Sequence, residues 1–164
     1  MLQHLLHLAA ILLLLGVANG TPIFARWIFR QHFDTPLDNG WLFVDGRPLF
    51  GESKTLRGIL TSVVATAMVA PLVGFSWITG AGLASAAMLG DLFSSFTKRR
   101  LNRPPHSQAL GLDQIPESLL PLLLLHQALG LNLWDMLGIV ATFIILELWL
   151  SRLLFRLHIR DRPY

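Results

Sequence analysis

Three short polar segments of this sequence carry residue types that bind phosphate groups or divalent metal ions. The first, residues 51–58, places Lys54, Thr55 and Arg57 between two glycines. In a Walker phosphate loop the lysine directly follows the second glycine, whereas here two residues intervene. The segment still suits an anion at the start of a helix, where backbone N–H groups are free and the helix dipole is positive. The alternative is that these cations only fix the orientation of a membrane protein.

The second segment, residues 90–100, carries one carboxylate and a run of cations. On a helix, Asp91, Ser95 and Lys98 share one face because they are four and three residues apart. Divalent ions such as Mg²⁺ prefer carboxylate and phosphate oxygens, so Asp91 is a candidate metal ligand, and Lys98 and Arg99 are candidates for phosphate binding. The alternative is a helix end at the membrane boundary whose charges only pair with each other.

The third segment, residues 111–117, contains two carboxylates, Asp113 and Glu117. They flank Pro116, a residue suited to the first turn of a helix. Carboxylates at this position can stabilise the helix N-terminus without any catalytic role. Together, however, the three segments supply the side chains needed to bind a nucleoside triphosphate with magnesium.

The composition indicates a membrane protein. Of the 164 residues, 53% are hydrophobic and 14% are charged, and there is no cysteine. So apolar a chain is not typical of a soluble enzyme. The absence of cysteine excludes disulfide bonds, thiolate metal sites and cysteine nucleophiles.

Long apolar runs predict an all-α integral membrane protein with five transmembrane helices in a single domain, residues 1–164. A helix of about 20 residues crosses the hydrocarbon core of a bilayer, which is about 30 Å thick. The first run could instead be a cleaved signal peptide, but no Lys or Arg precedes it. The predicted spans are about 2–18, 58–75, 77–96, 116–133 and 134–155, with polar loops at about 19–57 and 97–115.

The cations predict how these spans are oriented. All thirteen Lys and Arg residues lie in the two polar loops or in the C-terminal part from Arg152 onward, which includes Arg160 and Arg162. With five spans these regions share one side, so the positive-inside rule places them in the cytoplasm, with the N-terminus outside and the C-terminus cytoplasmic. In the third span, small residues recur every four positions at Gly82, Ala86 and Gly90. This pattern predicts close backbone contact and a central place in the bundle.

The polar segments resemble the CDP-archaeol synthase family of membrane CTP:lipid-phosphate cytidylyltransferases. The matching patterns are Gly-x-x-Lys-Thr-x-Arg-Gly at 51–58, Gly-Asp-Leu-x-x-Ser-Phe-x-Lys-Arg-Arg at 90–100 and Leu-Asp-Gln at 112–114. Asn19-Gly-Thr-Pro22, after the first predicted span, is similar to the family's Asn-x-x-Pro. The first two segments are also similar to phosphatidate cytidylyltransferases. The family pattern commonly continues Asp-Gln-x-Asp, and Pro116 stands where the second Asp would fall, so Glu117 is the candidate substitute.

The resemblance implies transfer of a cytidylyl group from CTP to an archaetidic-acid-like or phosphatidic-acid-like lipid, with release of pyrophosphate. It implies Mg²⁺ as cofactor and CTP, a membrane lipid phosphate and the bilayer as partners, with no nucleic acid. The active site would face the cytoplasm from a multi-pass protein of the cell membrane, and a lateral groove would admit the lipid. The implied catalytic residues are Lys54, Asp91, Lys98 and Asp113, the CTP or phosphate ligands are Thr55, Arg57, Ser95 and Arg99, and the metal ligands are Asp91, Asp113 and Glu117.

Two other functions remain open from the residues alone. Clustered cations beside a small-residue helix would also suit a small transporter or anion-conducting protein. In a non-catalytic membrane subunit the cations would only set topology. Two ionisable residues, His126 and Glu147, lie in apolar sequence outside the resemblance. For Glu147 we predict a structural pairing with a neighbouring helix or with Arg152.

Overall fold

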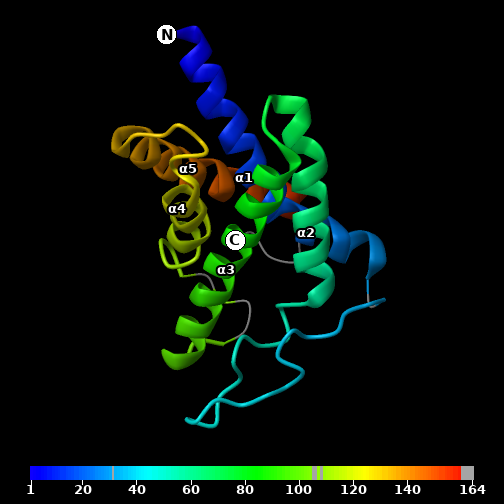
Figure 1. The fold of residues 1–164 in the computed structure, drawn as a ribbon. Helices are drawn as coiled ribbons and strands as arrows, with labels where there is room; N and C mark the ends of the chain where they lie inside the picture. Colours follow the sequence, from blue (N-terminus) through cyan, green and yellow to red (C-terminus); the bar gives the residue numbers. More distant parts are fainter. Residues whose placement is uncertain (31, 105–106, 108, 160–164) are drawn as a thin grey trace.

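The computed structural model describes residues 1–30, 32–104, 107 and 109–159. All of the regular elements in this part of the chain are helices (Figure 1). They are α1 (Leu2–Phe29), α2 (Leu56–Val69), the short 3₁₀ helix η1 (Ala70–Val73), α3 (Trp77–Arg100), α4 (Gln114–Leu125) and α5 (Leu133–Arg156). By length and composition α1, α2 continued by η1, and α5 can each cross a membrane. The predicted all-α fold is confirmed, and the number of crossings stays a prediction. Arg160 and Arg162 lie outside the described residues.

The first helix is longer than predicted and includes the start of the predicted first loop. α1 continues to Phe29 although Pro22 lacks the N–H that would bond the carbonyl group of Ala18. That carbonyl oxygen instead accepts a hydrogen bond of 2.7 Å from the hydroxyl of Ser62, a fully buried residue of α2. α1 therefore continues past residue 18, where the first predicted span ends, and a side chain from another helix bonds the carbonyl group that Pro22 leaves without an N–H partner. Asn19, expected after the span, lies inside α1.

The loop between α1 and α2 extends beyond the helix ends and is drawn in cyan in Figure 1. Its fold depends on Asp38, which is only 7% exposed. One carboxylate oxygen accepts hydrogen bonds from the N–H groups of Phe50 and Gly51, both at 2.9 Å, and the other accepts from Gly40 at 3.2 Å. Burial raises the pKa of Asp38, but these backbone donors outweigh burial and hold that pKa below its ordinary value. Asp38 thus fixes Gly51, where the segment leading into α2 begins.

α3 lies centrally and contacts α1, α2 and α4. The small residues of its predicted packing face differ in how closely a neighbouring helix approaches them. A Cβ atom added at Gly90 would overlap the carbonyl oxygen of Pro116 and lie 2.8 Å from the Cα of Glu117. At Gly82, an added Cβ would meet only the terminal methyl groups of Leu125, at 3.7 and 3.8 Å. Close backbone contact is therefore confirmed at Gly90, where α3 and the first turn of α4 touch.

We expect Gly90→Ala to lower the free energy of unfolding by about 1–3 kcal/mol, because the α4 backbone must move to admit the methyl group. The better helix propensity of alanine offsets about 1 kcal/mol of the cost at most. Thermal unfolding of the purified protein in detergent measures the change. Gly82→Ala on the same helix is the matched control and is expected to be tolerated. Equal thermal stability of the two variants would contradict the close contact at Gly90.

The fourth predicted span is shorter in the structure than in the sequence-based prediction. α4 has 12 residues and ends at Leu125, not at residue 133, so it is about 18 Å long against a hydrocarbon core of about 30 Å. Gly130 then adopts φ +61°, and the side chain of Asn132 caps α5 by accepting the N–H of Asp135 at 3.0 Å. The helix therefore ends before the predicted end of the fourth span, because residues that reverse the chain and cap the next helix cannot also continue α4.

The start of α1 is attached to this turn. His4 Nε2 lies 2.9 Å from a carboxylate oxygen of Asp135, and His7 Nε2 lies 2.7 Å from the carbonyl oxygen of Leu129. These contacts hold α1 beside α4 and α5, the helices that enclose the site described next.

Candidate active site

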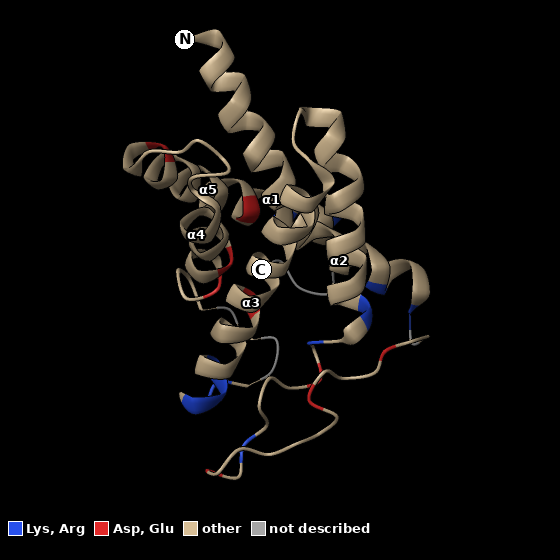
Figure 2. Cartoon of the chain, in the orientation of Figure 1, with Lys and Arg blue, Asp and Glu red and all other residues tan. Residues whose placement is uncertain are grey.

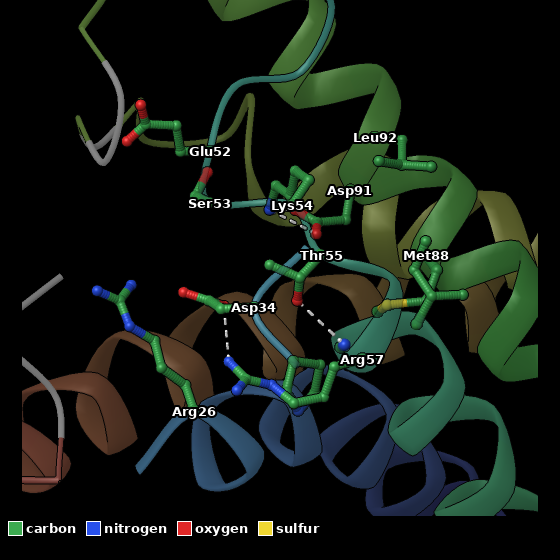
Figure 3. Close-up of a pocket in the computed structure, with 13 residues that line it drawn as sticks. Arg26, Asp34, Glu52, Ser53, Lys54, Thr55, Arg57, Met88, Asp91 and Leu92 are labelled. Atoms are coloured by element: carbon green, nitrogen blue, oxygen red, sulfur yellow. Dashed lines mark hydrogen bonds and ion pairs between the residues drawn. The ribbon is translucent and has the colours of Figure 1, made fainter. Parts of the chain in front are cut away.

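The structure brings the three polar segments together around one open groove of about 1540 Å³. Seven of the nine predicted site residues line it, namely Lys54, Asp91, Ser95, Lys98, Arg99, Asp113 and Glu117. The other two, Thr55 and Arg57, line an adjoining recess of about 180 Å³ that shares Lys54 and Asp91 with the groove (Figure 3). Figure 2 shows the charge pattern, with Lys and Arg gathered at helix ends and in loops while acidic residues also occur within α4 and α5.

The first charged pair of the groove joins the loop before α2 to α3. Lys54 Nζ donates to both carboxylate oxygens of Asp91, each at 2.6 Å, and the two side chains are 21% and 23% exposed (Figure 3). Thr55 is the N-cap of α2, where its hydroxyl oxygen accepts the N–H of Gly58 at 3.2 Å. This cap places Lys54 directly before the positive end of α2. The pair therefore offers one cation and one carboxylate at the same wall of the groove.

The second charged pair joins the end of α3 to the segment before α4. Lys98 Nζ lies 2.6 Å from Oδ1 of Asp113, with side chains 12% and 19% exposed. The other oxygen of Asp113 accepts the N–H of Ala109 at 3.0 Å. Ser95, which is 3% exposed, lies one turn after Asp91 on α3 and lines the same groove. The face predicted for this helix is thus turned toward the groove.

The two arginines of the predicted site hold the loops in place. Arg57 donates to the carboxylate of Asp34 at 2.8 Å and to the carbonyl oxygens of Arg30 and His32, so it ties the end of α1 to the start of α2. Arg99 donates to the carbonyl oxygen of Pro104 at 3.0 Å. Its Nε and Nη1 atoms are buried and have no hydrogen-bond partner among the described residues.

Glu117 lies on α4 and is 7% exposed. Its side chain lies near those of Glu147 on α5, Asp91 and Lys54. Both glutamates line the groove. The pairing of Glu147 with a neighbouring helix or with Arg152 stays a prediction, and its place at the groove was missed. The signal that could have found it is a carboxylate in an otherwise apolar helix, which marks a functional candidate by default.

The three predicted metal ligands do not form one cluster. Among the described residues, no group of three or more His, Cys, Asp and Glu side chains is placed to hold a metal ion. Asp91 and Asp113 are each paired with a lysine, whereas Oε1 of Glu117 is buried and receives no hydrogen bond from the part of the chain that the structure describes. Protein sites for Mg²⁺ commonly use one or two carboxylates and take the remaining ligands from substrate phosphates and water. The donor set therefore fits an Mg²⁺ ion that binds together with a nucleotide.

Apolar side chains also line the groove. They come from the facing parts of α1 and α5 and include Leu12, Leu13, Phe143, Leu146 and Leu150. A single groove thus joins a charged region to a surface suited to hydrocarbon.

Known proteins share the sequence and the fold of this chain. A family model described as CarS-like, CDP-archaeol synthase, matches residues 2–164. The chain is 35% identical to the CDP-archaeol synthase of Sulfurisphaera tokodaii over 154 residues, which cover 90% of this chain and 89% of the relative. It is 33% identical to the CDP-archaeol synthase of Pyrobaculum calidifontis over 153 residues, 90% of this chain and 91% of the relative. A solved structure described as an intramembrane enzyme for archaeal membrane lipids biosynthesis superposes with a TM-score of 0.75 at 28% identity, covering 87% of this chain and 90% of the other.

The chain belongs to the CDP-archaeol synthase family. It is a nucleotidyltransferase of lipid biosynthesis and a membrane protein, as the resemblance of its polar segments implied.

Proposed function

We propose that this protein transfers the cytidylyl group of CTP to the phosphate of an archaeol-type membrane lipid, giving a CDP-lipid and pyrophosphate. The observation that carries the proposal is the groove, in which Lys54, Asp91, Lys98 and Asp113 adjoin apolar side chains of α1 and α5. Charged groups suit a polyphosphate, and apolar walls suit a lipid chain. Membership of an enzyme family favours this function over a transporter or a non-catalytic subunit.

In the proposed reaction, a phosphate oxygen of the lipid attacks the α-phosphorus of CTP in line with the bond that breaks. A new P–O bond forms, the bond to the β-phosphate oxygen breaks, and pyrophosphate leaves with the electron pair. Such a reaction needs positioning and charge neutralisation but no covalent bond to the protein. The paired charges of the groove can meet this need by exchanging partners.

The exchange follows from the geometry of the two pairs. Without substrate, Lys54 and Lys98 are each neutralised by a carboxylate at 2.6 Å. A bound triphosphate offers both lysines stronger partners, which frees Asp91 and Asp113. Those carboxylates, with Glu117, are the groups we propose for Mg²⁺, which when bound would neutralise phosphate charge in the transition state.

The remaining predicted residues either hold the loop or contact phosphate in this proposal. The guanidinium group of Arg57 is already bonded to Asp34 and to two carbonyl groups, so we assign it to holding the loop. Arg99 retains unpartnered N–H groups at the groove and is suited to bind phosphate directly. The hydroxyls of Thr55 and Ser95 adjoin the same charged groups and can support a phosphate.

The test is an assay of pyrophosphate release by the purified protein with CTP, Mg²⁺ and one lipid phosphate at a time. We expect release only when both substrates are present, and faster release with an isoprenoid ether lipid phosphate than with diacyl phosphatidic acid. Reactions without lipid or without CTP are the controls. Solute flux across vesicles containing the protein, with no pyrophosphate release, would instead support a transporter.

We also propose five membrane crossings, with the N-terminus outside and the groove facing the cytoplasm. The confinement of cations to the two loops and the C-terminal part supports this orientation. Reporters inserted after Gly111 or fused after Tyr164 are expected to report the cytoplasm, and one inserted at Asn132 the opposite side. Finding Asn132 and Tyr164 on the same side would contradict the arrangement, since α5 must separate them.

A further inference from the structure

Gln114, the first residue of α4, carries an amide group that the reaction as proposed so far does not use. The residue is 3% exposed and lines the groove. Its Oε1 atom accepts the N–H of Gly111 at 2.9 Å, and a glutamine that reaches back in this way can cap the start of a helix. Capping explains the oxygen but not the nitrogen, because Nε2 donates to no acceptor among the described residues. A buried side chain thus keeps two N–H donors at the wall of the groove.

The contact with Gly111 fixes which way the amide group points. A backbone N–H can only donate, so its partner must be the amide oxygen, and a flipped amide would place a donor against it. Gly111 is itself held in a turn, with φ +82° and its carbonyl oxygen bonded to the N–H of Ile115 at 2.9 Å. The amide therefore presents its nitrogen as a donor at a fixed place. Its oxygen still has a second lone pair that can accept.

A donor next to an acceptor matches the edge of a cytosine ring. Cytosine has an acceptor at N3 beside a donor at N4, so one amide can form two hydrogen bonds with it, as Asn and Gln do with adenine. Uracil has the reverse order, N3–H beside the O4 acceptor, and would place a donor against Nε2. A phosphate group offers acceptors only and would leave the amide oxygen unused. The fixed amide therefore favours cytosine over both.

We propose that Gln114 is a specificity-determining residue that binds the N3–N4 edge of the cytosine ring of CTP. The preceding residue, Asp113, lies 2.6 Å from Lys98, so a base at Gln114 leaves the phosphates within reach of that pair. The groove, at about 1540 Å³, exceeds the size of about 300–1,000 Å³ that is usual for one small ligand, and so has room for a nucleotide beside a lipid chain. The inference rests on the proposed function, in which CTP is the nucleotide, and names how its base is recognised.

The experiment measures nucleotide binding to the purified protein in detergent, with Mg²⁺ and without lipid. Equilibrium dialysis with labelled CTP, with UTP or 3-deaza-CTP as competitor, gives a dissociation constant for each nucleotide. 3-Deaza-CTP has a C–H group in place of N3 and so lacks the acceptor for Nε2. We expect the unsubstituted protein to bind each competitor about 10-fold or more weakly than CTP, the scale of discrimination by one two-bond contact to a base.

Gln114→Glu is the decisive variant, because it keeps an oxygen for the N–H of Gly111 and should cap α4 as before. It replaces the N–H donors by an acceptor, which uracil N3–H can use and cytosine N3 cannot. We expect the preference for CTP over UTP to fall about 10-fold or more, and the preference over 3-deaza-CTP to be lost. The added negative charge weakens all three triphosphates alike, so it cancels in these ratios. Gln114→Ala, which lacks the amide, should also lose both preferences, and thermal midpoints report whether each variant folds.

Ser118→Ala is the matched control. The Ser118 hydroxyl donates to the backbone carbonyl oxygen of Gln114 at 2.7 Å, and this fully buried residue does not line the groove. The variant should keep both preferences even if its thermal midpoint falls.

Two results would overturn the inference. One is equal binding of CTP and UTP by the unsubstituted protein, or no binding of either. The other is a Gln114→Glu variant with unchanged ratios, which would mean that the amide contacts phosphate or only caps α4. The proposed function fails separately, if CTP is preferred through Gln114 but no pyrophosphate is released when a lipid phosphate is added.

Discussion

Asp91→Asn is expected to lower cytidylyl transfer by about 100-fold or more, the scale seen when one electrostatic contact to a transition state is removed. Both oxygens of Asp91 accept from Lys54 at 2.6 Å in the structure. Asparagine keeps the size of the side chain and one accepting oxygen, so the α3 geometry should persist. What it loses is the negative charge that a magnesium ligand needs. Expression and membrane insertion should hold, because removing a charge near a membrane span does not hinder insertion.

The measurement compares pyrophosphate release at several Mg²⁺ concentrations, with thermal stability as the check on folding. Asp45→Asn is the control: Asp45 pairs with Arg100 at 3.1 Å in the loop and lines neither cavity. Its activity should stay close to that of the unsubstituted protein. Full activity of Asp91→Asn with an unchanged Mg²⁺ requirement would rule out Asp91 as a metal ligand.

The location of the site could be predicted from sequence because its side chains are concentrated in three short segments. Every predicted site residue lines the groove or its recess. Polar residues are costly near a membrane interior, so segments that retain them there mark function more reliably than they do in a soluble protein. What sequence could not give is the pairing, since Lys54 and Asp91 are 37 positions apart. Either residue could equally have contacted the lipid headgroup alone.

The ends of the helices also depend on contacts that sequence does not show. Local rules favour a helix end at Pro22, whereas α1 continues through it, with the carbonyl group of Ala18 bonded to Ser62 of another helix. The same limit applies to Asp38, whose carboxylate orders the long loop by accepting three backbone N–H groups. No spacing or motif in the sequence indicates that Asp38 orders this loop. Glu147 was visible as an unusual residue, but only the packing of α5 on α4 places it beside Glu117.

Substitutions of Lys98 and Asp113 can test whether the pair binds phosphate and metal or only holds α3 to the segment before α4. Their ion pair, 2.6 Å long and mostly buried, joins the end of α3 to the segment before α4. Lys98→Asp or Asp113→Lys alone should lower the free energy of unfolding by about 1–2 kcal/mol, less than for a fully buried pair because solvent screens the remaining charge. Each should also lower turnover by about 100-fold or more, since a cation is lost from the phosphate site or a carboxylate from the metal site.

The double variant with Lys98→Asp and Asp113→Lys again has an ion pair between the end of α3 and the segment before α4, with the long and short side chains exchanged. Stability should therefore recover toward that of the unsubstituted protein, because the attraction between the two segments is the same with either polarity. Turnover should not recover, because the cation now lies on the segment before α4 and the carboxylate on α3, so neither meets the phosphate or metal group it served. Lys98→Arg, which keeps the charge on α3, should retain more activity than the double reversal at equal stability. Thermal unfolding and pyrophosphate release on the same preparations decide the matter: recovery of both together would mean that the pair only tethers α3 to α4.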